Sequence, residues 1–426
     1  MFTAPEPIVC KSIEEMLALL SKSEESGELR VIAIALGLLG GCCLDYNTGY
    51  DLLNSFVNLP DSGVRRGAAI GLALLGSRKD SGKLLRTLVE LLKDDQFIVR
   101  RGTALSLGML AAGRPNRQNA LELLSTMAKD PNPLMRWGAG VGLGLLGSAL
   151  YEVEEELELL QILMQDEDDS VRKGAIVGLG LLARNNPDFQ QSLALLQEMS
   201  KELDTDIQWL SALGLGLLGI SEPSFVDSVR LLRLTIENSV KEVQWGPAFG
   251  LGVVSASCTR EQGLSLLTSL LDKVDSSLRW GATVGLGLIS ARDKNPEEEW
   301  EILKGLFNEN DVYVRRGAVL ALAMSTASHS LVKDERHVLI DLLKDRDASV
   351  RWSAAFGLGL SCRTTQDAID FLKDVSFADT WVQLGAIFGI LSIRSDYTQV
   401  RFLGYALMAL SWWEEGVSIL LHFTPV

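Results

Sequence analysis

The side chains best suited to acid–base or metal chemistry are scarce in this sequence. Only three histidines occur, His329, His337 and His422, and the first two are eight residues apart. No second His/Glu pair recurs elsewhere, and a zinc or di-iron site needs more ligands at suitable spacing. We therefore predict no metal site, and we interpret His329 and His337 as surface residues around a helical hairpin.

Two runs of carboxylates, Glu154–Glu156 and Asp166–Asp169, are the next candidates for chemistry. Such runs can supply paired carboxylates or bind Ca²⁺, but neither has the glycine and closing glutamate of an EF-hand loop. We interpret the first run as a solvated helix start and the second as a loop with a helix cap. The Gly-Leu-Gly motifs, as at Gly142–Gly144, lie inside helical segments, whereas a phosphate-binding loop must follow a strand.

The thiols leave one chemical function open. The five cysteines are odd in number and match no metal or redox spacing, so we expect reduced thiols. Because no Ser/His/Asp or Cys/His arrangement can be argued from spacing, we predict no catalytic residue, no cofactor and no enzymatic activity. The alternative is a lyase or chaperone for a small apolar chromophore, because four cysteines lie near the ends of apolar helices. These are Cys42, Cys43, Cys258 and Cys362.

One apolar segment recurs along the chain and defines its organisation. It reads VRRGAAIGLALLG from Val64 and MRWGAGVGLGLLG from Met135, and successive copies up to Val350 begin 35 or 36 residues apart. A degenerate copy begins at Glu28, and another begins at Val382. A fixed period of this length is typical of a solenoid of stacked units.

Each unit is predicted to be a hairpin of two helices. The recurring segment, about 13 residues of apolar sequence, forms the inner helix, which we name helix B. Between copies, leucines such as Leu84, Leu88 and Leu91 recur at i, i+4 and i+7 among charged residues, which indicates an amphipathic outer helix A. We therefore expect an all-α superhelix of about eleven hairpins, either a strongly curved arc or a closed toroid.

The repeat boundaries divide the chain into three parts. We assign residues 1–27 to an N-terminal capping helix, residues 28–396 to the solenoid, and residues 397–426 to a C-terminal capping or axial helix. The most apolar stretch near that end, Val400–Trp413, is shorter than the roughly 20 residues that a membrane-spanning helix needs. We interpret it as a packing helix.

Two polar columns mark the start of helix B. An aspartate three residues before the first position of the segment is well placed to cap the helix. We interpret it, together with the basic or amide residue at the second position, as an Asp–Arg ladder that links neighbouring turns. The alternative is a ligand-binding row of arginines. The aspartates are Asp61, Asp168, Asp204, Asp275, Asp311 and Asp347, and the second column is Arg65, Arg100, Arg136, Arg172, Gln208, Gln244, Arg279, Arg315, Arg351 and Gln383.

The D-x-x-V-R pattern, as at Asp61–Arg65, resembles the short HEAT repeat, and the resemblance covers nearly the whole chain. Helix B is apolar where the usual HEAT helix is polar, for example at Ile70, Val141 and Phe249. Its small-x-x-x-Gly-Leu-Gly-Leu core, as at Gly138–Leu145, is similar to the proteasome/cyclosome repeat. That resemblance implies a scaffold subunit of a large assembly, with about eleven repeats closed into a ring around axial helices.

Helix B carries glycine at three repeated positions, Gly138, Gly142 and Gly144 in one copy. Each glycine costs roughly 1 kcal/mol relative to alanine, so their recurrence requires a compensating gain. Gly138 and Gly142 share one face, where the absence of side chains lets neighbouring helices approach closely. We predict closely spaced B helices that form a sharply curved inner layer.

Helix B is apolar on every side, which predicts that every side is buried. Columns that include Val141, Phe249 and Leu145 should give the concave face more apolar area than a monomer normally exposes. We expect this face to be covered either by ring closure with an axial helix, for which Phe402–Trp413 is the candidate, or by a partner.

The third position of the segment is the candidate partner-binding column. Tryptophan and arginine are both favoured at binding hot spots, and each stacks on the other. The functional interpretation is a ladder that grips an extended partner, and the structural alternative is stacking between repeats with no ligand. The predicted contact residues are Trp137, Trp209, Trp245, Trp280, Trp352, Arg66, Arg101 and Arg316, and Lys173 fills the same position.

The charge balance narrows the class of partner. The chain has 40 Lys+Arg against 55 Asp+Glu, a net charge of −15, which disfavours nucleic acids and anionic membranes. Residues 1–7 lack the features of a signal peptide, so we expect a cytoplasmic or nuclear protein without membrane insertion. The leading hypothesis is a non-enzymatic scaffold for other proteins, and a further alternative is a structural subunit of a larger assembly.

Overall fold

The computed structural model describes most of the chain between Tyr46 and Arg394, and the described residues contain helices but no strand. The predicted capping helix in residues 1–27 lies outside the described residues apart from Lys11 and Glu15, and the predicted helix in residues 397–426 lies wholly outside them. The described residues are 11, 15, 29, 32–37, 46–76, 82–112, 116–148, 153–183, 189–202, 204–219, 225–238, 245–255, 259–273, 275–291, 296–326, 333–362, 364–376 and 378–394.

The helices alternate between the two predicted kinds. The B helices are α4 (Ser62–Leu75), α6 (Phe97–Ala111), α8 (Pro133–Gly147), α10 (Asp169–Ala183), α12 (Thr205–Leu218), α14 (Trp245–Ser255), α16 (Ser276–Ser290), α18 (Val312–Thr326), α20 (Ala348–Leu360) and α22 (Thr380–Arg394). The A helices are α3 (Tyr46–Val57), α5 (Gly82–Leu91), α7 (Arg117–Met127), α9 (Glu154–Leu163), α11 (Phe189–Met199), α13 (Phe225–Asn238), α15 (Arg260–Leu271), α17 (Glu297–Leu306), α19 (Lys333–Leu342) and α21 (Thr365–Val375).

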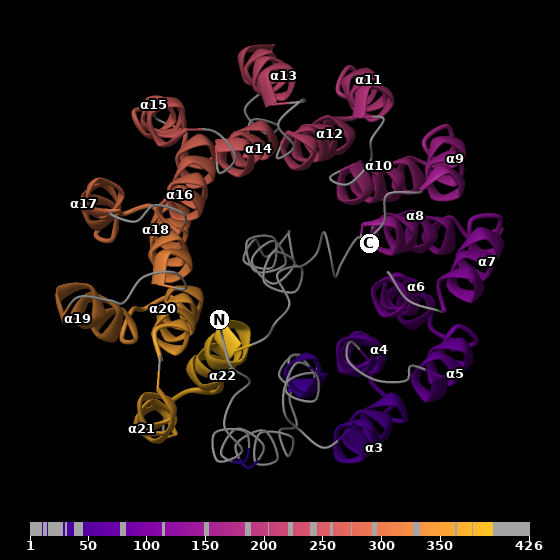
Figure 1. The fold of residues 1–426 in the computed structure, drawn as a ribbon, viewed down its shortest axis with the longest axis horizontal. Coiled ribbons are helices and arrows are strands. Elements are labelled where there is room, and N and C mark those ends of the chain that lie inside the picture. The colour runs from indigo at the N-terminus through magenta and orange to yellow at the C-terminus, as the bar shows by residue number, and fades with distance from the viewer. Residues whose placement is uncertain are drawn as a thin grey trace.

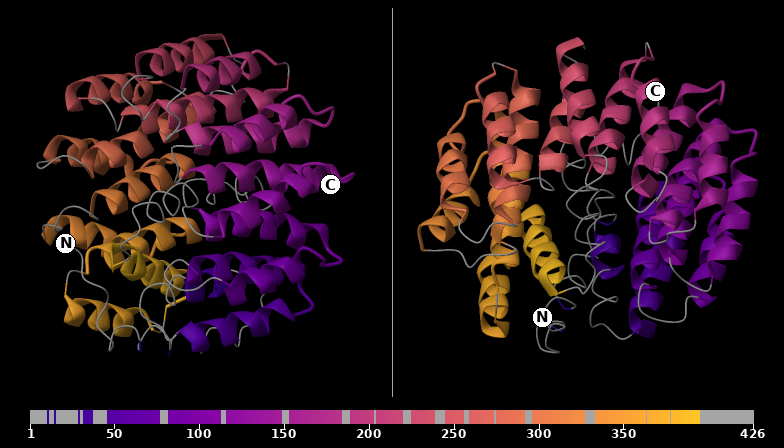
Figure 2. Two further views of the ribbon diagram at one scale, coloured as in Figure 1. Left: turned by 45° about the vertical axis from the view of Figure 1, so that its right-hand side comes forward. Right: turned by 45° about the horizontal axis from the view of Figure 1, so that its top comes forward.

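The B helices form an inner layer and the A helices an outer layer (Figure 1). Each B helix packs against the next B helix along the chain, and the described A helices pack mainly against B helices rather than against each other. The wall turns through a nearly complete circle, so that α22 comes round towards α3 and α4 (Figure 1). Two oblique views show the same two-layered wall (Figure 2). The prediction of an all-α, strongly curved solenoid is confirmed.

The glycines of helix B lie where neighbouring B helices meet. A Cβ atom added to Gly216 of α12 would lie 2.5 Å from the Cα atom and 2.9 Å from the carbonyl oxygen of Gly250 in α14. The same pairing joins Gly144 to Gly178. Because the obstructing atoms are backbone, no rotamer change can relieve the contact. The predicted close approach concerned the first two glycines of each copy, and it is confirmed at Gly142, where an added Cβ atom would lie 2.7 Å from the carbonyl oxygen of Ala104 in α6. The third glycine, represented by Gly144 and Gly216, makes the same kind of contact with the following B helix, which was not predicted.

Aspartate caps several of the B helices at their N-termini, whereas Asn132 caps α8 and Gln96 precedes α6 without a capping bond. Asp61 Oδ1 accepts a hydrogen bond from the backbone N–H of Val64 at 2.8 Å, and Asp204 Oδ1 accepts one from Ile207 at 3.0 Å. Each bond satisfies a donor that the first turn of a helix leaves without an intrahelical acceptor. The capping role predicted for these aspartates is confirmed, and it fixes the point at which these B helices begin.

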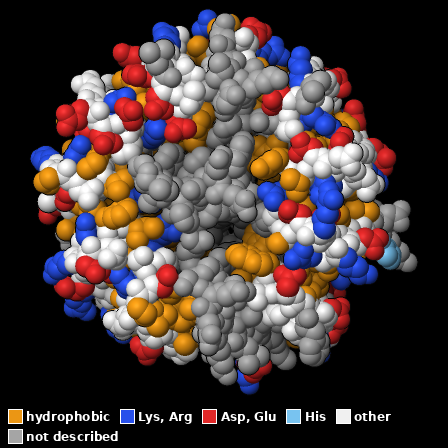
Figure 3. Space-filling view, turned by 180° about the vertical axis from the view of Figure 1, so that it is seen from behind, with side chains coloured by type: hydrophobic (Ala, Val, Ile, Leu, Met, Phe, Trp, Pro, Cys, Tyr) orange, Lys and Arg blue, Asp and Glu red, His pale blue; other side chains and the backbone are white. Residues whose placement is uncertain are grey.

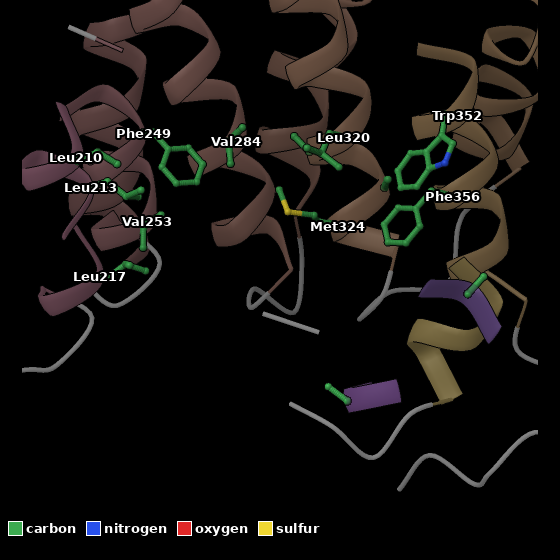
Figure 4. Close-up of a cluster of buried hydrophobic side chains, with 14 of the residues drawn as sticks. Leu210, Leu213, Leu217, Phe249, Val253, Val284, Leu320, Met324, Trp352 and Phe356 are labelled. Atoms are coloured by element: carbon green, nitrogen blue, oxygen red, sulfur yellow. The ribbon is translucent and has the colours of Figure 1, made fainter. Parts of the chain in front are cut away.

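Most inward-facing apolar side chains on helices α14 to α20 are buried, whereas some on other B helices, for example Met109 and Val177, are only partly buried. Phe249, Leu320 and Phe356 project to this side, with Val284 and Met324 between them (Figure 4), and all five are at most 3% exposed. Seen from behind, charged side chains cover the periphery, whereas described hydrophobic side chains gather nearer the centre (Figure 3). The prediction that helix B is buried on this side is confirmed for these residues.

Candidate functional site

The predicted partner-binding column lies in the first turns of the B helices, and most of it is buried. The four tryptophans with described side chains are between 1% and 6% exposed, and Arg66 and Arg101 are 2% and 1% exposed. Among the predicted residues whose side chains are described, Arg316 is the most accessible, with 17% of its side chain exposed. The side chain of Trp245 lies outside the described residues. The four described tryptophans are Trp137, Trp209, Trp280 and Trp352.

Six members of the column pack over the first glycine of the next B helix, namely Arg66, Arg101, Trp137, Trp209, Trp280 and Trp352. A Cβ atom on Gly174 would lie 2.8 Å from Cδ1 of Trp137, and one on Gly246 would lie 2.6 Å from Cβ of Trp209. The missing side chain of the glycine therefore makes the space that the tryptophan fills. This geometry corresponds to the structural alternative, stacking between repeats, and contact of the column with a partner stays a prediction.

Stacked rings continue this packing along the inner wall. The guanidinium of Arg101 lies 4.7 Å from the ring centroid of Trp137. Phe249 and Trp280 stack with centroids 5.4 Å apart and planes 20° apart. Burial lowers the pKa of Arg101 to about 10, so its guanidinium still carries its charge at neutral pH and is stabilised by the ring face.

Cations in the same column bridge to the next helix cap. Arg316 Nη2 donates to Asp347 Oδ2 at 2.8 Å, and Asp347 Oδ1 also accepts hydrogen bonds from the N–H groups of Ser349 and Val350 at 3.0 and 3.2 Å. Burial alone would raise the pKa of Asp347, but the hydrogen bonds from Arg316 and Ser349 outweigh it and hold that pKa well below its usual range. Asp347 therefore caps α20 and ties α18 to it.

Replacing Asp347 with alanine should lower the free energy of unfolding by about 2–3 kcal/mol, because both the cap and the charge-assisted bond are lost. Asp347→Asn keeps a capping oxygen and should lose only about half as much. The pKa of Asp347 is lowered on folding, so its stabilisation is present above its ordinary value of 3.8 and is lost as the pH falls below it. Urea unfolding at pH 7 and pH 3 should therefore show a smaller difference from wild type at pH 3.

An equal loss for Asp347→Ala at both pH values would contradict this account, because an effect independent of the carboxylate would then dominate. Ser376→Ala, at an exposed position after α21, is the matched control and should change stability little at either pH.

The arginines of the second column pair with acidic residues of the next repeat, but in most copies not with the predicted capping aspartates. Arg65 Nε lies 2.8 Å from Asp94 Oδ2, and Arg136 Nε lies 2.7 Å from Asp166 Oδ2. Arg65 Nη1 also donates to the carbonyl oxygen of Leu59 at 3.0 Å, so each arginine joins its own turn to the next. The hydrogen bond from Arg136 lowers the pKa of Asp166. The same kind of pair recurs at Arg279–Glu309, Arg315–Asp345 and Arg351–Asp379. The predicted link between neighbouring turns is therefore present, but the predicted partner is wrong in most copies, because acidic residues such as Asp166 and Asp345 lie two residues before the capping aspartates.

The residues considered for metal or thiol chemistry do not converge in the described part of the chain. His337 is exposed on α19, whereas His329 and His422 lie outside the described residues. Cys362 is buried, with its Sγ atom 3.3 Å from the carbonyl oxygen of Leu358. Among the described residues no group of three or more His, Cys, Asp or Glu side chains is placed to hold a metal ion. The cysteines Cys10, Cys42, Cys43 and Cys258 are outside the described residues.

Comparison with known proteins identifies the repeat. A family model for HEAT repeats matches residues 85–180 and 301–390. The chain is a HEAT-like repeat protein. No curated protein matches this HEAT-like chain. The finer resemblance to the proteasome/cyclosome repeat stays a prediction.

Two solved structures similar to this HEAT-like protein share low sequence identity with it. An engineered protein is 20% identical, with 85% of this chain and 99% of that chain covered and a TM-score of 0.33. Kap121p, solved bound to Pho4p, is 14% identical, with 94% of this chain and 47% of that chain covered and a TM-score of 0.41. The HEAT-like chain therefore spans about half the length of Kap121p. None of its described helices combines the length and the apolar character needed to cross a bilayer.

Accessible apolar side chains on the outer helices were not foreseen from the sequence. Ile162 on α9 is 67% exposed, and Val226 and Leu234 on α13 are 72% and 45% exposed. These side chains lie outside the face of each A helix that packs against the B helices. Assigning each leucine, isoleucine or valine of helix A to its angle around the helix would have revealed them.

Proposed function

We propose that this chain is a non-enzymatic scaffold that holds partner proteins on its repeat surface, either alone or as a subunit of a larger assembly. The observation that carries the proposal is the two-layered wall, in which the A helices pack inward on B helices and present their other side outward (Figure 1). Repeat arrays provide long binding surfaces, because each unit adds surface without requiring a separate core.

The accessible end of the predicted column supports one place for such contact. Tyr313 at the start of α18 is 43% exposed, and the guanidinium of Arg316 lies 5.4 Å from its ring centroid. Trp381 occupies the equivalent position at the start of α22 and is 37% exposed. Aromatic residues and arginine dominate binding hot spots. We therefore propose that partners contact the edge formed by the N-termini of α18, α20 and α22.

The inner wall supports a separate proposal for the C-terminal part of the chain. The inward side chains of Phe249, Met324 and Phe356 are buried, so this part of the inner face is not accessible to a partner. Residues 397–426, which lie outside the described residues, include the apolar stretch Val400–Trp413. A helix that is apolar all round is stable only when it is surrounded. We propose that this segment caps or fills the ring.

The compartment is also a proposal. Five cysteines without a pairing pattern are consistent with a reducing environment. A net charge of −15 disfavours binding to nucleic acids and to anionic membranes. We therefore place the scaffold in the cytoplasm or the nucleus. Its proposed partners are other proteins.

Affinity purification combined with cross-linking mass spectrometry tests the scaffold function. We expect partner proteins at near-stoichiometric amounts, with cross-links to the A helices and to the edge at Tyr313 and Trp381. Tyr313→Ala with Arg316→Ala should reduce partner recovery about tenfold or more, as expected for hot-spot residues. Lys129→Ala, exposed at the α7–α8 turn on the same edge, is the matched control. Recovery of a bound pigment with no protein partner would contradict the proposal and favour the chromophore alternative.

A further inference from the structure

The outer face of α9 is acidic and carries one apolar side chain. Glu155, Glu158 and Ile162 are all exposed, and Ile162 is 67% exposed. At 3.6 residues per turn they lie within about 60° of one another around the helix. Among the described residues neither glutamate takes part in an ion pair. The face therefore offers two carboxylates and an isoleucine along one stripe.

The outer face of α13 has the opposite charge. Val226, Arg230 and Arg233 are exposed, with Val226 72% exposed and the Arg230 side chain 65% exposed. Leu234 adds a second apolar side chain beside them. These residues lie within about 100° of one another around the helix. A basic, apolar stripe of this kind is unusual on a chain with a net charge of −15.

The two stripes match in register when the helices run antiparallel. Ile162 lies four residues after Glu158 and seven after Glu155, whereas Val226 lies four residues before Arg230 and seven before Arg233. Antiparallel alignment of Ile162 with Val226 therefore places a glutamate opposite each arginine. Antiparallel packing also brings the two helix dipoles into their favourable arrangement.

We propose that the outer face of α13 in one molecule docks on the outer face of α9 in a second copy of this chain. The two faces lie on different A helices of the same wall, so one molecule cannot bring its own α9 and α13 together (Figure 1). The contact is heterologous, and each molecule presents both halves of it. Association therefore extends from copy to copy. The inference does not depend on the proposed partner scaffold, because it needs no other protein.

The strength of the contact follows from its size. One pair of short helices buries less surface than the roughly 1,200 Å² of a stable complex, so we expect weak association that grows with protein concentration. Two carboxylates on α13 compete for the arginines: Asp227, whose Oδ1 lies 3.2 Å from Arg230 Nη2, and the exposed Glu237, four residues after Arg233. An exposed pair three residues apart on one helix is weak and yields readily to a second carboxylate.

Sedimentation of the full chain across micromolar to several hundred micromolar concentration tests the proposal. We expect the average mass to rise with concentration above that of one chain, and to rise less at high salt. Two charge-reversed variants each remove one half of the contact: Arg230→Glu with Arg233→Glu, and Glu155→Arg with Glu158→Arg. Each should need about tenfold or more protein to associate to the same degree. All four residues are exposed, so circular dichroism should be unchanged.

Mixing the two variants provides the decisive comparison. The first keeps a native α9 face that fits the native α13 face of the second, and the two reversed faces are also opposite in charge. An equimolar mixture should therefore regain the concentration-dependent association that each variant alone has lost. Glu122→Arg on α7, an exposed reversal outside both stripes, should associate like wild type. The proposal is overturned if the wild-type chain stays monomeric at the highest concentration, if the variants associate as wild type does, or if the mixture stays monomeric. A negative result for self-association would not affect the test of the scaffold function. That test measures the recovery of other proteins and concerns the edge at Tyr313 and Trp381 rather than the outer faces of α9 and α13.

Discussion

Replacing Gly216 with alanine should destabilise the wall by about 2 kcal/mol. A Cβ atom at this position would lie 2.5 Å from the Cα atom and 2.9 Å from the carbonyl oxygen of Gly250, so α12 and α14 must separate. Overpacking of this kind costs about 3 kcal/mol, and the better helix propensity of alanine returns about 1 kcal/mol. Urea unfolding followed by circular dichroism measures the difference.

The matched control is Gly305→Ala on the outer helix α17. No atom lies within 4 Å of a Cβ atom added at Gly305, which is exposed. The same chemical change should therefore stabilise the chain by about 0.5–1 kcal/mol through helix propensity alone. The opposite signs of the two variants separate close helix packing from propensity. Stabilisation of both variants would refute the close approach of α12 and α14.

The loss at Gly216 should also be local. In a stacked array, stability is a sum of the stability of each unit and of the interfaces between neighbours. Amide hydrogen exchange in Gly216→Ala should rise most in α12 and α14 and less in distant helices such as α4 and α20. A uniform rise along the whole ring would indicate that the solenoid opens as one cooperative unit.

The parts of the fold that repeat could be predicted from the sequence. The features that recur in copy after copy are the repeat period, the two kinds of helix, the caps at Asp61 and Asp204, and the close approach at Gly142. The residue pattern of one short segment is often compatible with more than one secondary structure. A pattern that recurs in many repeats removes this ambiguity. The arginine column was recognised for the same reason, but its acidic partners were assigned to the capping aspartates, whereas Arg136 and Arg315 pair with Asp166 and Asp345, two residues earlier.

The burial of the predicted partner column could not be settled in this way. The angle of Trp137 around its helix indicates the side on which it lies, but exposure depends on the neighbouring unit. Trp137 is buried because it fills the space left by Gly174, which lies 37 residues further along the chain. The sequence contains both columns, yet nothing in one helix shows that they meet.

The outer helices carry less repetition, and prediction there was weaker. The run Glu154–Glu156 was interpreted as a solvated helix start, and the structure agrees for Glu154 and Glu155, which are exposed. The interpretation is wrong for Glu156, whose side chain is 0% exposed and is paired with Arg117. The partner lies 39 residues away on the preceding A helix. A pairing that occurs in only some repeats leaves no column to recognise.

Replacing Arg117 with alanine should therefore cost about 3–5 kcal/mol, the largest loss that we expect from a single outer residue. Arg117 Nη2 donates to both carboxylate oxygens of Glu156 at 2.8 Å, and its loss leaves a buried charge without its cation. Arg260 makes the equivalent bond to Glu299, whose side chain is also 0% exposed, so Arg260→Ala should behave alike. Lys93→Ala, which removes an exposed ion pair with Glu90, should have little effect.

The pH dependence of Arg117→Ala gives the sharper test, because a packing defect would not follow it. Burial already raises the pKa of Glu156 above its ordinary 4.5, with Arg117 opposing the rise, so removal of Arg117 raises that pKa further. A raised pKa in the folded state means that Glu156 destabilises the variant least below pH 4.5 and increasingly as the pH rises through the folded value. The loss relative to wild type should therefore be large at pH 7 and small near pH 4.5. Arg117→Met combined with Glu156→Met removes both charges and should restore most of the stability at pH 7.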